Sequence, residues 1–197
     1  MERASAKQER IAARRTYMLL RAALFAQLSK RPFEQSTLTD ICSTALVSRS
    51  TFYRYFEDKY DLLRYCLQSL LEESGLSDEV IYFRNMENIR RFLDVLLQNL
   101  NENTVMYQKI FQANKDGDLF RIIRRGLIQI LTDNLLAAEQ NGYRLKLSAP
   151  VYTSLLADFY FDIVKCYLEQ ADQMDCSAFI ESVCRFVERD FFEEREG

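Results

Sequence analysis

Apolar residues recur along most of the chain at the spacing of an α-helix. Leu20, Leu24 and Leu28 lie one turn apart in an expected first helix over residues 8–29, which Pro32 ends. The same spacing predicts further helices from residue 57, over 89–100, from 103 to 115, from 119 to 141, over 150–170 and from 177 onward. With 2 prolines and 5 glycines in 197 residues, little of the chain suits long loops. We predict an all-α fold of about nine or ten helices.

Residues 36–63 predict two short helices joined by a tight turn. The first has one apolar stripe, spaced i, i+3, i+4 and i+7, at Leu38, Ile41, Cys42 and Ala45. The second begins after Ser48, whose hydroxyl suits an N-cap, and places Phe52 and Phe56 one turn apart on its buried face.

The opposite face of the second short helix carries hydrogen-bond donors and no acid. Its members are Arg49, Ser50, Thr51, Tyr53 and Arg54. A short helix that is buried on one side and rich in donors on the other suits the groove of DNA. The alternative is a helical hairpin whose polar face only meets solvent.

This segment resembles the DNA-binding region of the TetR family of transcriptional repressors. The matching residues are Thr37, Ala45, Val47, Ser48, Thr51, Phe52, Tyr53, Phe56 and Lys59. The chain departs from the family at Leu46, where glycine is usual, at Ser50, and at Tyr55, where histidine is usual. A leucine in a turn that needs φ > 0 costs about 1 kcal/mol or more unless the turn is rebuilt.

The donor-rich face and the resemblance together indicate which side chains are expected to meet DNA. They are Thr37, Ser48, Arg49, Ser50, Thr51, Tyr53, Arg54, Tyr55 and Lys59. Tyr53 and Lys59 are expected to contact phosphates. Arg49 and Thr51 in the first turn are expected to reach base edges, with a phosphate contact as the alternative for Arg49.

Charge is distributed unevenly along the chain. The net charge is −3, but residues 1–65 hold 12 Lys and Arg against 7 Asp and Glu, a net of +5, which leaves −8 for the remainder. A basic part followed by an acidic part suits a protein that meets phosphates at one end only. The candidate basic residues are Arg10, Arg14, Arg15, Arg21, Lys30, Arg31, Arg49, Arg54 and Lys59.

The segment Glu72–Asp78, which contains Gly75, interrupts the helical pattern and is the expected domain boundary. We therefore expect a helix-turn-helix DNA-binding domain over residues 1–71. Residues 72–197 are expected to form a larger helical domain that binds an effector and dimerises.

The helix over 150–170 is apolar around most of its circumference, so both of its sides should be buried. In the TetR resemblance, the last two helices of each chain form a four-helix dimer bundle. The expected interface residues are Phe159, Ile163, Tyr167, Ile180, Val183 and Val187. The alternative is that these side chains only complete the core of a monomer.

The chain has 14 Phe and 11 Tyr, most of them beyond residue 80. Apolar walls with a few hydroxyls would suit a small apolar or aromatic effector. The candidate cavity residues are Tyr107, Phe111, Phe120, Tyr152, Phe159 and Tyr160. Ordinary core packing is the alternative for each of them.

Several classes of protein are disfavoured. The chain has no histidine, which removes the usual metal ligand, and no nucleophile elbow or glycine-rich phosphate loop, so we expect no cofactor and no enzyme. Its 5 cysteines form no C-x-x-C pair, which favours reduced core thiols over a disulfide framework, with a redox-sensing thiol as the rival. No apolar stretch reaches the length of a membrane span, and the N-terminus has no apolar signal core. A cytoplasmic protein is expected.

We interpret the sequence as a homodimeric, TetR-like regulator, expected to be a repressor, that binds palindromic double-stranded operator DNA and is released by an effector. An effector would shift the population between two spacings of the recognition helices, with the helix after residue 57 as the lever. The alternative is a DNA-binding adaptor that a protein partner controls and that has no small-molecule pocket.

Overall fold

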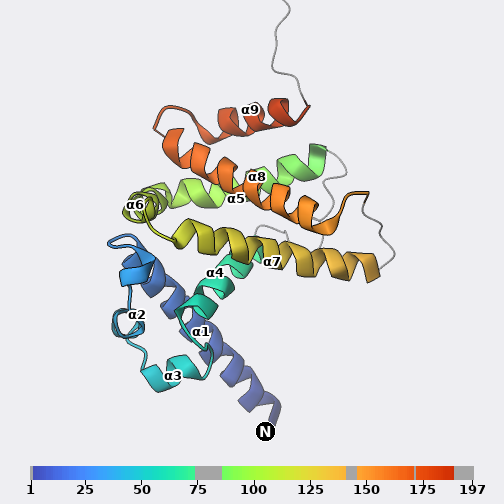
Figure 1. Ribbon diagram of the computed structural model, residues 1–197. Coiled ribbons are helices and arrows are strands. Elements are labelled where there is room, and N and C mark those ends of the chain that lie inside the picture. The colour runs from blue at the N-terminus through green and yellow to red at the C-terminus, as the bar shows by residue number, and fades with distance from the viewer. Residues whose placement is uncertain (1, 74–85, 141–145, 171, 189–197) are drawn as a thin grey trace, which may run out of the picture. The chain divides into compact units, whose positions relative to one another are not determined.

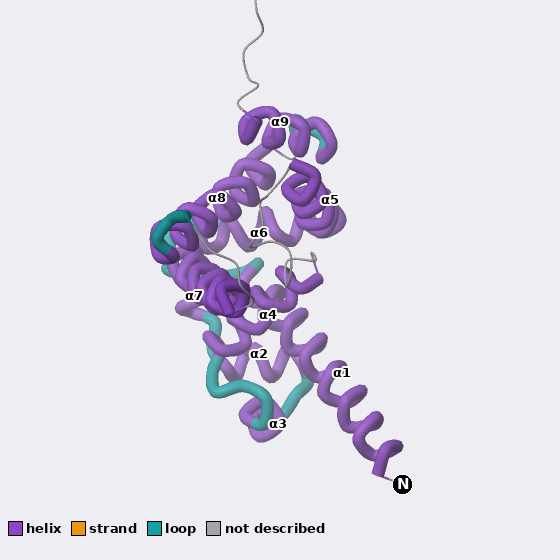
Figure 2. The backbone as a smooth tube through the Cα atoms, turned by 90° about the vertical axis from the view of Figure 1, so that its right-hand side faces the viewer, coloured by secondary structure: helices purple, strands orange, loops and turns teal. Residues whose placement is uncertain are grey.

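A computed structural model describes residues 2–73, 86–140, 146–170 and 172–188. Every regular element in these ranges is a helix, so the prediction of an all-α fold is confirmed (Figure 2). The elements are α1 Glu2–Leu28, the 3₁₀-helix η1 Phe33–Gln35, α2 Leu38–Ala45, α3 Arg49–Tyr53, α4 Lys59–Glu73, α5 Met86–Glu102, α6 Thr104–Asn114, α7 Leu119–Gln140, α8 Ala149–Gln170 and α9 Cys176–Glu188 (Figure 1). Most of the expected boundary segment and the expected end of the helix over 119–141 lie outside the described residues.

The chain forms two compact units. One consists of Met1–Gln68 and Lys109–Ile123, and the other of Ser69–Gln108 and Arg124–Gly197. Helices α4, α6 and α7 each contribute residues to both units. The expected division after residue 71 treats the chain as two contiguous parts. That division does not assign residues 109–123 to the first unit. Hydrophobic spacing indicates which face of a helix is buried, but it does not indicate which part of the chain covers that face.

The core of the first unit forms where α1 packs against α2. Leu20 and Leu24 are fully buried on α1, as are Phe33 of η1, Ile41 of α2 and Phe52 of α3. An aromatic cluster extends this core, since the Tyr17 ring lies 5.6 Å from Phe56 and 4.8 Å from Tyr65, centroid to centroid. These contacts fix the short helices α2 and α3 on α1.

The core of the second unit is built on the packing of α5 against α9. Leu93 and Leu97 of α5 are fully buried. The Tyr167 ring of α8 lies 5.3 Å from Phe179 of α9, and its hydroxyl donates to Asn101 Oδ1 at 2.8 Å. None of the described helices is long and apolar enough to cross a membrane.

An ion pair joins α7 to α8 within the second unit. Arg124 Nη2 donates to Asp158 Oδ2 at 2.8 Å and to Ser154 Oγ at 2.8 Å, and Arg124 Nε donates to Asp158 Oδ1. Hydrogen bonds from the guanidinium hold the pKa of Asp158 below its usual range. This bidentate pair sets the register of α7 along α8.

Candidate nucleic-acid interface

Helix α2 begins with a capping box. Asp40 N donates to Thr37 Oγ1 at 3.1 Å, and Thr37 N donates to Asp40 Oδ2 at 3.2 Å. The Thr37 hydroxyl also donates to Asp40 Oδ2 at 2.7 Å, and these bonds lower the pKa of Asp40. Thr37 is exposed to solvent at the start of α2, and its hydroxyl proton is already engaged in the hydrogen bond to Asp40.

The turn after α2 has the geometry of a glycine turn, although a leucine occupies it. Leu46 has φ 54° and ψ 37°, the only left-handed non-glycine residue among those described. Leu46 N donates to Ser43 O at 3.2 Å and Val47 N donates to Cys42 O at 3.0 Å, the bond pattern of a Schellman motif. The turn is therefore not rebuilt around leucine, whose side chain is 94% exposed.

Helix α3 begins at the predicted N-cap. Thr51 N donates to Ser48 Oγ at 3.1 Å, and Phe52 is fully buried. The helix ends at Tyr53, so Phe56 lies beyond it, contrary to the expectation of one helix carrying both phenylalanines. Phe56 still reaches the same core, with its ring centroid 5.6 Å from that of Phe52.

The outward face of α3 is rich in donors and contains no acid. Arg49, Ser50, Tyr53 and Arg54 are exposed, and Thr51 is half-buried. The Arg49 guanidinium lies 6.0 Å from the Tyr53 ring centroid, and its Nη2 is 3.5 Å from the Tyr53 hydroxyl. An arginine lying along a neighbouring tyrosine has fewer conformations to lose when it binds a planar acceptor pair.

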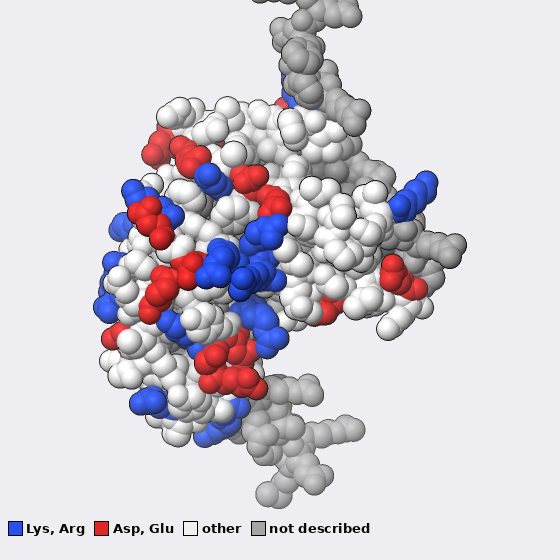
Figure 3. Space-filling model, in the orientation of Figure 1, with Lys and Arg blue, Asp and Glu red and all other residues white. Residues whose placement is uncertain are grey.

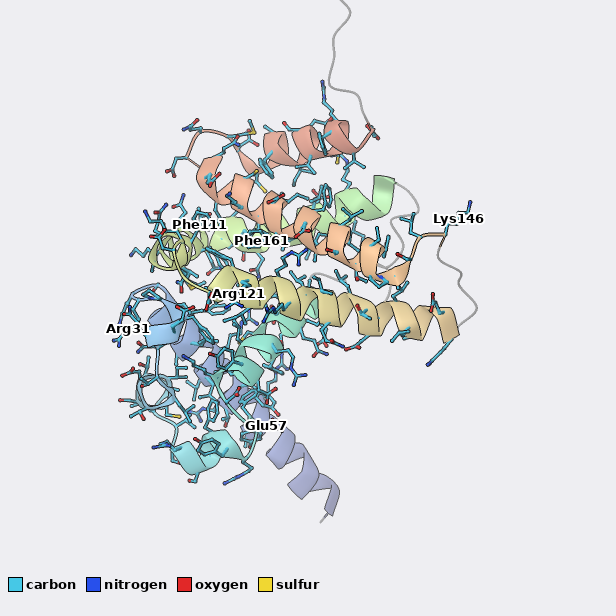
Figure 4. All side chains as sticks on the ribbon, viewed as in Figure 1. Arg31, Glu57, Phe111, Arg121, Lys146 and Phe161 are labelled. Carbon is cyan, nitrogen blue, oxygen red and sulfur yellow. The ribbon has the colours of Figure 1, made fainter. Side chains whose placement is uncertain are left out.

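Tyr55 occupies the position where the resembling family has histidine. Its ring is half-buried and packs edge-on against Tyr17 of α1, with centroids 5.2 Å apart. Glu57 follows in the connection from α3 to α4 (Figure 4).

Lys59 donates hydrogen bonds to backbone carbonyls of its own chain. Its ammonium donates to the carbonyls of Phe33 at 2.8 Å, Glu34 at 3.3 Å and Ser36 at 2.9 Å, and it lies 4.5 Å from the Phe33 ring centroid. Burial lowers its pKa. An ammonium has three N–H donors, and all three are engaged here. We therefore correct the expected phosphate contact: Lys59 fastens η1 to the start of α4.

Some of the other basic side chains are paired with acids. Arg31 contacts Asp40 at 3.5 Å, whereas Arg14, Arg15 and Lys30 are exposed. The guanidinium of Arg21 lies 5.8 Å from the Phe25 ring centroid. The side chain of Arg10 lies outside the described set. The face of the molecule in Figure 3 carries basic and acidic side chains side by side, so the outward face of α3 is distinguished by its lack of acids.

The candidate effector residues divide between the two units. Phe111 and Phe120 belong to the first unit, and their ring centroids are 5.1 Å apart (Figure 4 labels Phe111). The other four belong to the second unit, where Tyr107, Tyr152 and Phe159 are half-buried and Tyr160 is buried. Burial raises the pKa of Tyr160, and the nearby Tyr152 adds to the shift.

Three of the expected dimer residues face inward. Ile163, Tyr167 and Ile180 are buried within their own chain, so they offer no surface to a second copy, and we correct this part of the expectation. Phe159, Val183 and Val187 are half-buried. The exposed apolar side chains of α8 and α9 are instead Val151 at 50%, Leu155 at 62% and Phe186 at 64%.

A signal for the outward residues of α8 was present in the sequence, because Val151 and Leu155 are apolar and lie one helical turn apart. Their outward direction could not be predicted from the sequence, because an almost wholly apolar helix does not reveal which side faces out. Among the described residues, no cluster of three or more Cys, Asp or Glu side chains is arranged to hold a metal ion.

Known proteins resemble both the helix-turn-helix and the whole fold. The family described as "Bacterial regulatory proteins, tetR family" matches residues 19–66. The HTH-type dhaKLM operon transcriptional activator DhaS of Lactococcus lactis is 29% identical over 109 residues, which are 55% of this chain and 56% of that protein. The match thus spans little more than half the length of this curated relative.

Two solved structures share the fold. The fatty acid degradation regulator FadR from Bacillus halodurans has a TM-score of 0.57 at 15% identity, over 87% of this chain and 94% of that one. FadR from Bacillus subtilis, solved in complex with stearoyl-CoA, has a TM-score of 0.54 at 18% identity, over 89% and 100%. The family match covers α2, α3 and the capped turn between them, so the helix-turn-helix of this chain is similar to that of the tetR family of bacterial regulatory proteins.

Proposed function

We propose that this protein binds operator DNA as a homodimer through α3 and regulates transcription of the genes beside that operator. The observation that carries the proposal is the outward face of α3. Four donor side chains are exposed there without an acid, on a helix held in place by buried Phe52 and the Ser48 cap. Donors without acids match phosphate oxygens and the acceptor atoms of purines in the major groove.

Dimerisation follows from what one such helix can achieve. A five-residue helix contacts few bases, and two-fold symmetry doubles those contacts on a palindrome. The exposed apolar side chains of α8 and α9 supply a surface for a second copy. Val151 and Leu155 on α8 and Phe186 on α9 replace the three buried residues in the proposed interface. A stable pair of chains needs to bury about 1,200–2,000 Å² in total.

Repression is the expected sign of regulation, because a dimer seated on a promoter blocks access to that DNA. The Lactococcus lactis relative is named an activator, so the sign has to be measured in its own right. Comparing transcripts of the neighbouring genes with and without the protein decides it. Repression predicts that those transcripts rise when the protein is removed.

The proposed effector is a small amphipathic molecule that meets the aromatic residues of the second unit, among them Tyr107, Tyr152 and Phe159. Their half-buried rings and hydroxyls suit a mostly apolar ligand with a polar end. The fold holds such a molecule in one neighbour, the Bacillus subtilis FadR with stearoyl-CoA. Release of the protein from DNA by stearoyl-CoA but not by free CoA would support this effector class. Equal DNA binding with both would favour control by a protein partner.

Footprinting on the intergenic DNA beside the protein's own gene tests the proposal. The unmodified protein should protect two half-sites, each with the same sequence in opposite orientation. An Arg49→Ala, Arg54→Ala double variant should lose the footprint while its helical content is unchanged. A footprint that survives the double substitution would place the DNA-binding surface elsewhere.

A further inference from the structure

The last residue of α6 is buried inside the unit that carries the helix-turn-helix. Asn114 is 0% exposed, and its amide makes three hydrogen bonds. Nδ2 donates to Leu28 O at 2.9 Å and to Ile110 O at 2.8 Å, and Oδ1 accepts from Phe33 N at 2.8 Å. Both amide protons and the amide oxygen are therefore engaged.

The partners of Asn114 lie on either side of one connection. Leu28 is the last residue of α1, whose terminal carbonyls have no partner within the helix, and Phe33 is the first residue of η1. Residues 29–32 join these two elements. Asn114 thus fastens both ends of the connection that leads from α1 into the helix-turn-helix. A buried carbonyl and a buried N–H would lose their partners without it.

A second contact reinforces the first. Glu34 Oε1 accepts from Asp118 N at 2.6 Å, directly before the first turn of α7. Gly117 permits the close approach, because a Cβ there would lie 3.0 Å from Glu34 Oε2. A carboxylate at the N-terminal end of a helix is favoured by the helix dipole. Since the Lys59 ammonium donates to the Phe33 and Glu34 carbonyls of the same 3₁₀-helix, η1 is fastened to α4 and to residues 114–118 at once.

Helices α6 and α7 continue beyond this point as parts of the second unit, over residues 104–108 and 124–140. The helix-turn-helix is therefore attached to α6 and α7 in addition to α4. In a dimer, the stiffness of that attachment sets which separations of two half-sites both recognition helices can reach. A stiff linkage gives a high effective concentration at one span, and a loose one gives a lower maximum over many spans.

We propose that Asn114 and Glu34 are positioning residues for operator recognition, which hold the helix-turn-helix on α6 and α7 and thereby fix the half-site spacing that the dimer accepts. This inference rests on the proposed dimeric DNA binding. Neither residue touches DNA in this account, so binding to one half-site does not depend on them. The preference for one separation of the half-sites does depend on Asn114 and Glu34.

The test measures binding of the full chain to two kinds of duplex. One carries a single half-site, and the other carries paired half-sites whose separation varies in steps of one base pair. The variants are Asn114→Ala and Glu34→Ala. Gln27→Ala is the matched control, because Gln27 is another nearly buried amide of the first unit, and its Nε2 donates to Thr44 Oγ1 at 2.8 Å within residues 1–68.

The unmodified protein and Gln27→Ala should bind the best separation at least about tenfold more tightly than separations two base pairs away. In Asn114→Ala and Glu34→Ala this ratio should fall below about threefold, with single half-site affinity unchanged. The inference would be overturned if both Glu34→Ala and Asn114→Ala kept the tenfold ratio. Glu34→Ala is the safer variant for this comparison, because its exposed side chain can be removed without opening the core. If the unmodified protein binds paired half-sites no better than one, the proposed dimeric function itself fails.

Discussion

The Lys59 ammonium donates to the Phe33 carbonyl at 2.8 Å and lies over the ring of the same residue, 4.5 Å from its centroid. The contact ties the first turn of α4 to η1, 26 residues earlier in the chain. It converts a lysine that the family resemblance assigns to DNA into a structural cation. That change of role can be measured.

Lys59→Ala should lower the free energy of unfolding by about 1–3 kcal/mol, because three carbonyls lose the ammonium that donates to them, although that of Phe33 keeps a second donor, Ser36 N. It should leave the salt dependence of DNA binding unchanged, since no phosphate contact is removed. Urea unfolding and binding at several salt concentrations provide the two measurements. Lys30→Ala, which removes an exposed lysine, is the control for stability. A salt slope reduced by about 0.9 in Lys59→Ala would restore the phosphate assignment.

Leu46→Gly should stabilise the protein by about 1 kcal/mol, because glycine adopts φ 54° without the strain that leucine bears there. The 94% exposed side chain contributes no packing that the substitution would remove. Leu46→Ala keeps a Cβ and should show no such gain. The midpoint of urea unfolding, followed by circular dichroism, checks both variants. Equal midpoints for the two would show that the turn stores no strain.

Arg49→Ala should relax the preference for one base pair in each half-site by about 1–3 kcal/mol, as expected for loss of a bidentate contact to guanine. Arg49→Lys should relax it as well, since an ammonium does not reproduce the planar pair of donors. Competition between operators that differ at single positions measures the effect. A uniform loss of affinity at every position would assign Arg49 to the phosphate backbone.

Leu155→Glu and Phe186→Glu should each disfavour dimers by several kcal/mol, because each leaves an unpaired charge in the proposed interface. Met18→Glu, at an equally exposed apolar position on α1, should leave the dimer intact. Sedimentation at micromolar concentration compares the three variants. A dimer that survives both substitutions on α8 and α9 would move the interface to another surface.

The local features of the fold could be predicted from the sequence. Capping depends on residues within one turn, so Ser48 was recognisable as the N-cap of α3 from its neighbours alone. The helical spacing of apolar residues likewise placed the described α-helices, although α3 proved shorter than expected and the 3₁₀-helix η1 was not predicted. The departure at Leu46 marked the one turn, among the residues that the structure describes, in which side chain and backbone conflict.

Features that depend on distant parts of the chain could not be predicted. The contacts of Asn114 bridge 81 and 86 residues, and no local pattern distinguishes this asparagine from a solvated one. Lys59 matched a family motif, but its actual partners are carbonyls of η1 and of the C-cap residue Ser36, which the motif does not include. On α8, apolar residues on almost every side concealed the inward direction of Ile163 and Tyr167.

Binding selection from a pool of randomised duplexes tests whether the protein recognises an operator as a dimer through α3. The unmodified, full-length protein should enrich an inverted repeat whose half-site centres lie about one helical turn apart, roughly 34–36 Å. It should do so as a complex of two chains per duplex. Enrichment of a single unpaired site, or no enrichment over the starting pool, would contradict dimeric operator recognition through α3.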